Sequence, residues 1–283
     1  MFNLILENEN GDSISMTDTA NRYMTSKIEG LNPPTSIIST SNYAGMNGSY
    51  LNNAFIDKRN VVIHFEMRGI NIEQRRHELY RIVKTSRYLK IYYRTANISV
   101  YTEGYVETCE MNNFEQLTSG QISVICPDIY WYSTESQYAY YSKESGAFTF
   151  PFSIDEKGVP LGYYSDTSSI MIVNDGDETG FTIQLEALEE VKNPCIYCNE
   201  DNSYLRINTT MQKGDVIIIS TKIGKRTVVL NRYGEESNII NLLSSGSTWF
   251  TLKAGKNNYT VTAQYGLQNQ KVKMIHTNAY LGV

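Results

Sequence analysis

Hydrophobic residues recur at every second position along most of this chain. Short runs of this kind, rich in β-branched and aromatic residues, occupy residues 61–67, 89–93, 98–101, 121–125 and 169–173. Gly, Asn, Asp or Ser residues bound them. Such alternation places apolar side chains on one face of an extended strand and polar side chains on the other. The pattern predicts a mainly β protein.

One stretch, residues 71–84, follows a helical period instead. Ile72, Leu79 and Ile82 return to one side of a helix. Asn71 stands where an N-cap residue is expected. We predict one principal helix here, packed on a sheet.

The sequence also predicts two domains, at residues 1–135 and 136–283, because a chain of 283 residues is long enough for two cores. Its texture changes near residues 133–152, where Ser, Thr, Glu and Gly mix with tyrosines. Beyond that point, turn signals recur at intervals of roughly ten residues, a spacing typical of a β-sandwich.

Charge and motifs exclude several classes of function. The net charge of −5 argues against binding to the phosphate backbone of nucleic acid, because such binding needs clustered Lys and Arg. The common phosphate, zinc-protease and serine-hydrolase signatures are missing from the sequence. The motif Cys195–Cys198 has no second pair at zinc-site spacing, and the acidic cluster 175–178 lacks the other positions of an EF-hand loop. We expect no enzyme, no cofactor and no metal.

Tyrosine is the one compositional oddity, with 22 residues in the chain. Six aromatic residues crowd the expected domain junction: Tyr130, Trp131, Tyr132, Tyr138, Tyr140 and Tyr141. Aromatic faces with polar tips suit a protein interface or the stacking of sugar rings, and they also simply pack strand faces. These three interpretations stay open at this point.

Several ordered segments carry a family resemblance. In the second half these are residues 214–221, 224–228, 249–257 and the closing Tyr280-Leu281-Gly282-Val283. In the first half they are residues 30–34, the stretch from Gly48 through Phe65 into the helix, and Pro127-Asp128-Ile129-Tyr130-Trp131. This order resembles the distal tail proteins of long-tailed, siphophage-type phages and prophage tail proteins.

The resemblance implies a fold and a role. The fold would be an N-terminal tail-tube-like β-sandwich or barrel with one packed α-helix, followed by a C-terminal galectin-like or carbohydrate-module-like β-sandwich. The role would be that of a structural hub in the tail tip or baseplate of the virion. A homohexameric ring, formed by residues 1–135, would join the tail tube to tail-tip and receptor-binding proteins and leave a channel for DNA, while residues 136–283 would face outward.

The same resemblance implies the partners. These would be other copies of the chain, the major tail tube protein, the tape-measure protein, and tail-tip, tail-associated lysin or baseplate proteins. DNA would be present only in transit, and no membrane insertion is expected. The protein would be made in the cytoplasm of the bacterial host.

We expect the subunit contacts in three places, namely the helix, an extended arm within residues 32–60, and the tyrosine-rich junction. The candidate interface residues are Tyr43, Tyr50, Arg75, Arg76, Arg81, Tyr130, Trp131 and Tyr132. The alternative is a carbohydrate-binding protein that contacts host cell-wall glycans. Trp249 is its candidate contact, although the Trp-Phe-x-Leu segment also suits packing in the sandwich core.

Overall fold

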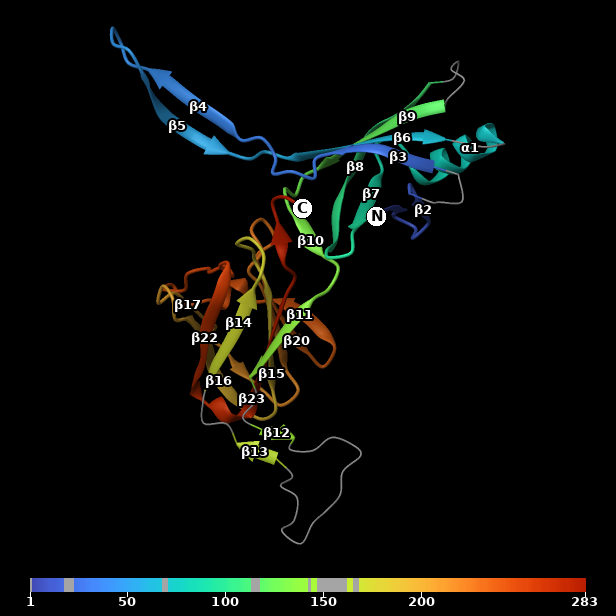
Figure 1. Ribbon diagram of the computed structural model, residues 1–283. Coiled ribbons are helices and arrows are strands. Elements are labelled where there is room, and N and C mark those ends of the chain that lie inside the picture. The colour runs from blue at the N-terminus through green and yellow to red at the C-terminus, as the bar shows by residue number, and fades with distance from the viewer. Residues whose placement is uncertain are drawn as a thin grey trace. The chain divides into compact units, whose positions relative to one another are not determined.

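The computed structural model describes residues 2–17, 23–67, 71–112, 118–141, 144–146, 162–164 and 168–283. The described chain is mainly β, with a single α-helix, which confirms the predicted fold class (Figure 1). It forms two compact units: residues 1–135 together with 279–283, and residues 136–278. The last five residues, which the sequence analysis assigned to the second domain, lie in the first unit because β24 pairs with β10 there.

A nine-stranded antiparallel sheet is the frame of the first unit. Its main path runs β2-β1-β7-β8-β9-β6-β3, and β10 pairs with both β8 and β24. The two ends of the path do not pair in the described chain, so the sheet does not close into a barrel there. The strands are β1 (Asn3–Asn8), β2 (Ser13–Ser15), β3 (Tyr23–Glu29), β6 (Arg59–Met67), β7 (Tyr88–Arg94), β8 (Ser99–Met111), β9 (Thr118–Cys126), β10 (Trp131–Ser133) and β24 (Ala279–Tyr280).

Alternation within the strands builds the core of this unit. In β6, for example, Val61, Ile63 and Phe65 are buried, while the residues between them are half-exposed. The helix α1 (Ile72–Ile82) adds Leu79 and Ile82 to the same core, as its apolar period predicted.

The N-terminus of α1 differs from the prediction in one respect. Asn71 occupies the N-cap position, but its side chain makes no capping hydrogen bond. Its backbone is left-handed, with φ 64° and ψ 41°, instead of the extended conformation usual for a capping residue. Asn tolerates this conformation better than most residues, so Asn71 serves here as a turn residue.

A separate hairpin leaves the first unit between β3 and β6. Its strands, β4 (Ile37–Asn42) and β5 (Ser49–Phe55), pair only with each other, and their register shifts between Ser39 and Thr40. Figure 1 shows it as a two-stranded ribbon.

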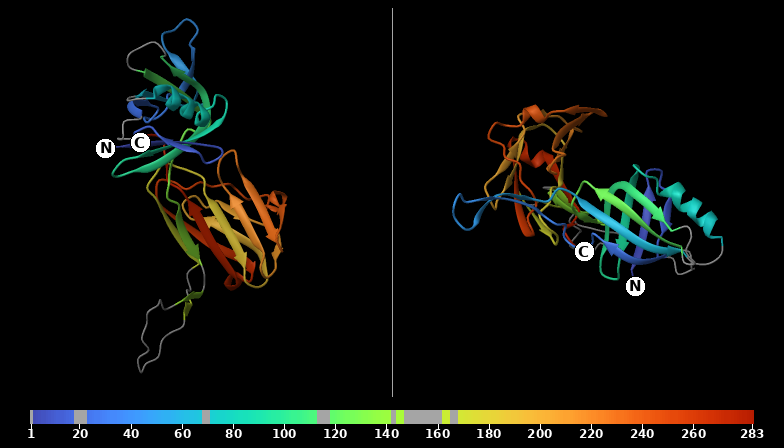
Figure 2. Two further views of the ribbon diagram at one scale, coloured as in Figure 1. Left: turned by 90° about the vertical axis from the view of Figure 1, so that its right-hand side faces the viewer. Right: turned by 90° about the horizontal axis from the view of Figure 1, so that it is seen from above.

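The second unit is a β-sandwich, in agreement with the sequence. Figure 2 shows its strands in two further views. Residues from both of its sheets share one core, in which the ring of Phe181 lies 6.1 Å from that of Phe250 and 5.4 Å from that of Tyr259. One sheet has the order β11 (Gln137–Tyr141), β23 (Gln270–His276), β15 (Thr182–Ala187), β19 (Val216–Ser220), β20 (Thr227–Arg232) and β21 (Glu235–Asn238). The other contains β14 (Ser169–Asn174), β22 (Gly255–Tyr265), β16 (Val191–Cys198), β17 (Tyr204–Arg206) and β18 (Thr210–Met211).

Three short elements complete the second unit. The strands β12 (Glu144–Gly146) and β13 (Gly162–Tyr164) form a small hairpin of their own. Two 3-10 turns, η1 (Ile240–Leu242) and η2 (Leu267–Asn269), connect neighbouring strands.

Candidate assembly surfaces

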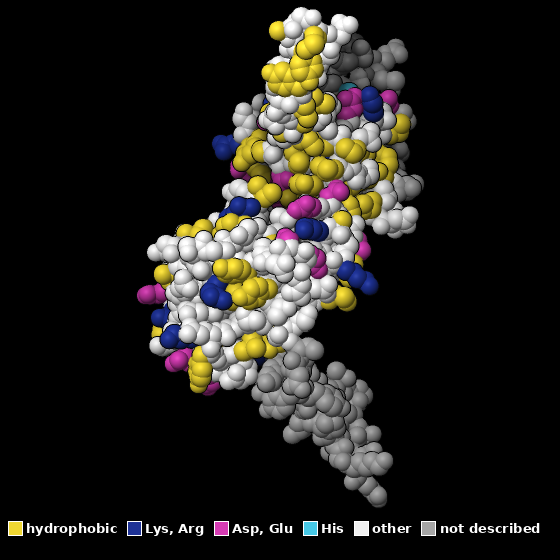
Figure 3. Space-filling view, turned by 90° about the vertical axis from the view of Figure 1, so that its left-hand side faces the viewer, with side chains coloured by type: hydrophobic (Ala, Val, Ile, Leu, Met, Phe, Trp, Pro, Cys, Tyr) yellow, Lys and Arg dark blue, Asp and Glu magenta, His cyan; other side chains and the backbone are white. Residues whose placement is uncertain are grey.

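The β4–β5 hairpin exposes large apolar side chains on both of its faces. All of its strand residues except Ser41 are exposed. Figure 3 shows hydrophobic side chains gathered on the hairpin, which lies at the top of that view. They belong to Ile37, Ile38, Tyr43, Met46, Tyr50, Leu51 and Phe55. A two-stranded hairpin is marginally stable in water by itself, and contiguous exposed apolar surface marks interaction sites.

The predicted interface residues Tyr43 and Tyr50 both lie on this hairpin. Their ring centroids are 5.6 Å apart, and about half of each side chain is accessible, with exposed fractions of 45% and 49%. The pair therefore leaves aromatic surface exposed.

A buried arginine ties the base of the hairpin together. Arg59, the first residue of β6, is 1% exposed. Its guanidinium donates to the carbonyl oxygens of Asn32 at 2.9 Å, of Ile129 at 2.7 and 2.9 Å, and of Leu281 at 2.5 Å, and also to that of Gly30. No carboxylate pairs with it in the described part of the chain. Burial lowers the pKa of Arg59, although an arginine keeps its proton inside proteins.

Gly30 and Trp131 belong to the same hydrogen-bond cluster around Arg59. The indole Nε1 of Trp131 donates to the Gly30 carbonyl at 3.2 Å, and the Arg59 guanidinium lies 5.8 Å from the Trp131 ring centroid. Gly30 has a φ of +88°, and a Cβ there would collide with the Asn60 carbonyl oxygen, so only glycine fits. Both ends of the hairpin are therefore held at one point.

Trp131 is completely buried in the core of the first unit. This overturns its selection as an interface residue, because a side chain without accessible surface cannot contact a partner directly. The short strand β10 explains the error, since three residues give too little alternation to show which face is buried.

Tyr130 and Tyr132, in contrast, are half-buried members of a tyrosine cluster on β7, β8 and β10. Ring centroids lie 6.3 Å apart for Tyr130 and Tyr132, 6.0 Å for Tyr132 and Tyr101, and 6.1 Å for Tyr101 and Tyr92. The Nζ atom of Lys90 is 4.0 Å from the Tyr101 centroid. Burial, and then the nearby carboxylate of Asp128, raise the pKa of Tyr132, which stays protonated and donates to Asp128 at 2.8 Å.

The three predicted arginines of α1 have different environments. Arg81 is exposed, while Arg75 and Arg76 are half-buried. The Arg76 Nε atom is buried and has no hydrogen-bond partner in the described structure. A buried donor of this kind gains from a carbonyl or carboxylate brought by another molecule.

Trp249, the candidate glycan contact, is only partly exposed and packs against the core of the second unit. The guanidinium of Arg226 lies 5.4 Å from its ring centroid. The core contacts and the Arg226 guanidinium therefore reduce the indole surface that is accessible.

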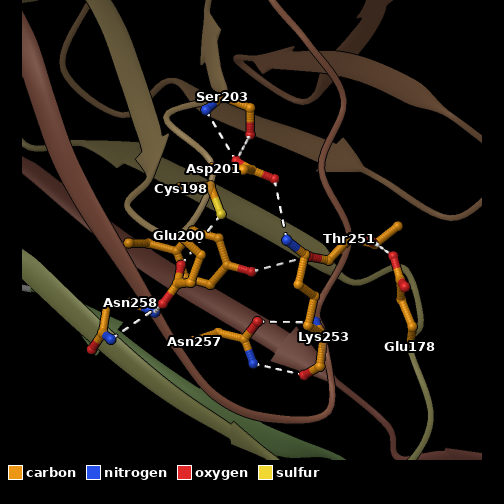
Figure 4. A network of polar contacts seen from close by, with 10 residues as sticks. Glu178, Cys198, Glu200, Asp201, Ser203, Thr251, Lys253, Asn257 and Asn258 are labelled. Carbon is orange, nitrogen blue, oxygen red and sulfur yellow. Dashed lines mark hydrogen bonds and ion pairs between the residues drawn. The ribbon is translucent and has the colours of Figure 1, made fainter.

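A network of polar side chains at one end of the sandwich has structural partners (Figure 4). Glu200 accepts hydrogen bonds from the backbone and side-chain nitrogens of Asn258 at 2.6 and 3.2 Å, and Asp201 pairs with Lys253 at 3.6 Å. Cys198 donates to Glu200 at 3.4 Å, and burial raises the pKa of its thiol to about 11. These groups hold turns in place, and the cysteine is not poised as a nucleophile.

Within the described residues, no group of three or more His, Cys, Asp or Glu side chains could hold a metal ion. No described helix is long and apolar enough to cross a membrane.

The described chain thus combines an open sheet with one packed helix, an apolar hairpin and a β-sandwich. Residues 10–126 match the family model of a phage tail protein RIFT-related domain, and residues 176–280 match that of a siphovirus-type tail component, C-terminal domain. The chain belongs to the siphophage distal tail protein family.

Solved structures have the same fold over almost the whole chain. The Dit protein (gp 19.1) of phage SPP1, described as a paradigm of the hub adsorption apparatus in phages that infect Gram-positive bacteria, is 12% identical with a TM-score of 0.69. The alignment covers 98% of this chain and 99% of that one. The phage P2 baseplate in its activated conformation with Ca matches with 11% identity, a TM-score of 0.53 and 98% coverage of both chains. No curated protein matches the chain.

Proposed function

We propose that this chain forms a hexameric ring that acts as the hub of a phage tail tip. The ring would join the tail tube to the tail-tip and receptor-binding proteins and leave a passage for DNA. Membership of the distal tail protein family supports this role. The structural likeness to the SPP1 hub protein supports it at the level of the fold.

The β4–β5 hairpin is the structural feature that best supports the proposed ring. Its apolar side chains cover both faces of a two-stranded ribbon, and nothing in the described chain packs on them. A cyclic ring needs a heterologous contact, in which one surface of a copy meets a different surface of the next. An arm that reaches a neighbour supplies such a contact and buries the exposed apolar surface.

The other proposed contacts are Tyr130, which directly precedes β10, Tyr132 on β10, and the arginines of α1. Arg81 is exposed, and Arg75 and Arg76 are half-buried, so each leaves side-chain surface that a neighbouring copy can contact. In this arrangement the first unit, residues 1–135 with 279–283, forms the ring, and residues 136–278 face outward.

The proposed partners are the major tail tube protein, the tape-measure protein and the tail-tip, tail-associated lysin or baseplate proteins. The net charge of −5 suits a passage that lets DNA through without retaining it, since like charges repel. The role needs no chemistry from the chain itself. The protein would be made in the host cytoplasm and reside in the virion tail.

The test is the native mass of the purified chain by light scattering, together with negative-stain images. We expect a hexamer, or two stacked hexamers, with a central hole. The double variant Ile38→Ser, Leu51→Ser removes two hairpin side chains that are 63% and 62% exposed, and it should reduce the assembly to monomers. The control Ile223→Ser changes a side chain that is 79% exposed in a turn of the second unit, and it should leave the ring intact.

Two results would contradict the proposal. If the double variant assembles like the wild type, the hairpin does not make the ring contact. If the wild-type chain remains a monomer even with the tail tube protein present, the ring itself is wrong.

A further inference from the structure

The edge strand β11 of the second unit carries two tyrosines that face away from the core. Tyr138 is 53% and Tyr140 is 64% exposed, while Tyr141 between the sheets is buried. The two rings are stacked, with centroids 6.4 Å apart and planes inclined by 22°. Two nearly parallel rings at alternate positions of one strand form a flat aromatic strip.

A cation lies against this strip. Lys273 on β23 pairs directly with Tyr140, and its Nζ atom is 4.5 Å from the Tyr138 ring centroid and 5.8 Å from that of Tyr140. In the described part of the chain Lys273 forms no ion pair with a carboxylate. Its ammonium group is therefore held in place by neutral rings, and its charge remains available to an anion.

The neighbouring positions on the same face of the sheet are mixed, with Ile275 beside Lys273 on β23 and polar residues on β15 beyond them. Gln184 on β15 lies directly opposite Lys273, and Thr182 lies opposite Ile275, the partner of Tyr138. Ser220 on β19 continues the row beyond Thr182. The aromatic strip is thus bordered by the Lys273 ammonium and the Ile275 side chain, and the amide of Gln184 and the hydroxyl groups of Thr182 and Ser220 lie further along the same sheet face.

We propose that this face binds a saccharide that carries an anionic group. A sugar ring presents a face of C–H bonds, which packs on an aromatic ring, and a rim of hydroxyl groups, which need donors and acceptors beside that ring. Tyr138 and Tyr140 supply the aromatic faces, and Gln184 and Thr182 supply the polar groups. Lys273 supplies the charge that an acidic substituent complements.

The arrangement favours a saccharide over a protein partner. Protein interfaces concentrate their binding free energy in well-packed apolar pockets from which water is excluded. Here the rings lie on the outer face of a sheet, beside Lys273 and Ile275 on β23, and Gln184 and Thr182 follow on β15, the strand beyond. The inference does not depend on the ring, because all of these residues belong to the second unit.

The experiment begins with a glycan array that carries neutral, uronic-acid-containing and phosphate-substituted saccharides, probed with the full chain. The strongest ligand is then titrated by calorimetry against the wild type and against Tyr138→Thr, Tyr140→Thr and Lys273→Gln. Threonine keeps a high strand propensity, so the edge strand should survive the change. The matched control is Tyr265→Thr, a strand tyrosine of the same unit that is 60% exposed.

We expect each tyrosine variant to weaken binding about tenfold, the loss of one aromatic stacking contact. Lys273→Gln should weaken binding of the anionic saccharide and leave a matched neutral saccharide unaffected. Tyr265→Thr should bind like the wild type, and the native mass should be the same for all variants.

Three outcomes would overturn the proposal. The array could show no saccharide bound, or the three variants could bind as tightly as the wild type. The tyrosine variants could also change the native mass while no saccharide binds, which would assign the face to a protein contact. None of these outcomes bears on the hairpin, whose variants test the ring separately.

Discussion

Arg59 offers the sharpest test of how the first unit is held together. Its five hydrogen bonds reach four carbonyl oxygens, in segments that precede β4, precede β10 and close the chain. The substitution Arg59→Met keeps a long apolar stem and removes every donor. Arg59→Lys keeps the charge but replaces the planar fork by a single ammonium group, which cannot span the same four acceptors.

The magnitude follows from the acceptors that would lose their partners. A buried carbonyl without a donor costs about 1–3 kcal/mol. The Gly30 carbonyl keeps the Trp131 indole as a donor. If one of the other three carbonyls reaches water after the substitution and two do not, the loss is about 2–6 kcal/mol. Removing a desolvated charge offsets part of this cost. We therefore expect Arg59→Met to destabilise the first unit by about 3 kcal/mol, and Arg59→Lys by somewhat less.

The assay can be confined to the first unit, because each of the two units of the chain contains one tryptophan. In a Trp249→Phe background, urea unfolding followed by fluorescence reports on Trp131 alone, 5.8 Å from the Arg59 guanidinium. The control is Arg87→Met, which removes a surface pair to Glu9 at 3.9 Å and should cost less than about 1 kcal/mol. Hydrogen exchange at the Val283 amide, which bonds to Leu31, should speed up in Arg59→Met only.

The reasoning fails if Arg59→Met and Arg87→Met unfold at the same urea concentration. It also fails if the Val283 amide stays protected in Arg59→Met, because the C-terminal segment would then be held by other contacts.

Two further predictions concern the stability of the second unit, which is followed by the fluorescence of Trp249. Burial lowers the pKa of His276 below its usual 6.5. On acidification the unfolded chain therefore binds a proton at a higher pH than the folded chain does, and the free energy of unfolding should fall as the pH drops below about 6.5. His276→Met should abolish this slope, while His77→Gln, an exposed change on α1, should keep it. Burial alone would raise the pKa of Asp215, but hydrogen bonds from Arg232 and the Gln212 amide lower it below 3.8. The ionised Asp215 therefore stabilises the folded unit above pH 3.8, and this contribution is lost as the pH falls further. Asp215→Asn should cost about 1–3 kcal/mol at pH 7 and flatten the acid limb of the stability curve, and an unchanged limb would show that the pair contributes nothing.

The strands and the helix could be predicted because their order is local. The alternation in residues 61–67 is visible without any other part of the chain, and β6 covers it. The apolar period of residues 71–84 likewise predicted α1 to within two residues at its C-terminal end. The hairpin β4–β5 showed no such alternation, since Ile37 and Ile38 are adjacent and both faces are exposed. Its Ser, Asn, Gly and Tyr composition was the only signal of an arm.

The role of Arg59 could not be predicted, because its acceptors lie far away in the sequence. The Leu281 carbonyl is 222 residues from Arg59, and the Ile129 carbonyl is 70 residues away. Carbonyl acceptors also leave no mark on side-chain identity, so no pairing with an acidic residue reveals the site. The orientation of Trp131 was missed for a related reason, since its burial depends on the same distant contacts.

Three of the segments that carry the family resemblance meet at Arg59: residues 30–34, residues 127–131 and the closing residues 280–283. An apolar arm makes a specific contact only if its base fixes where its side chains point, because an arm with a loose base would lose conformational entropy on docking. The hydrogen-bond cluster around Arg59 provides that fixed base at both ends of the hairpin. If the proposed ring forms through the hairpin, its assembly should therefore be coupled to the stability of the first unit. Arg59→Met should then weaken assembly at urea concentrations where the unit is still folded, although no side chain of the hairpin has changed.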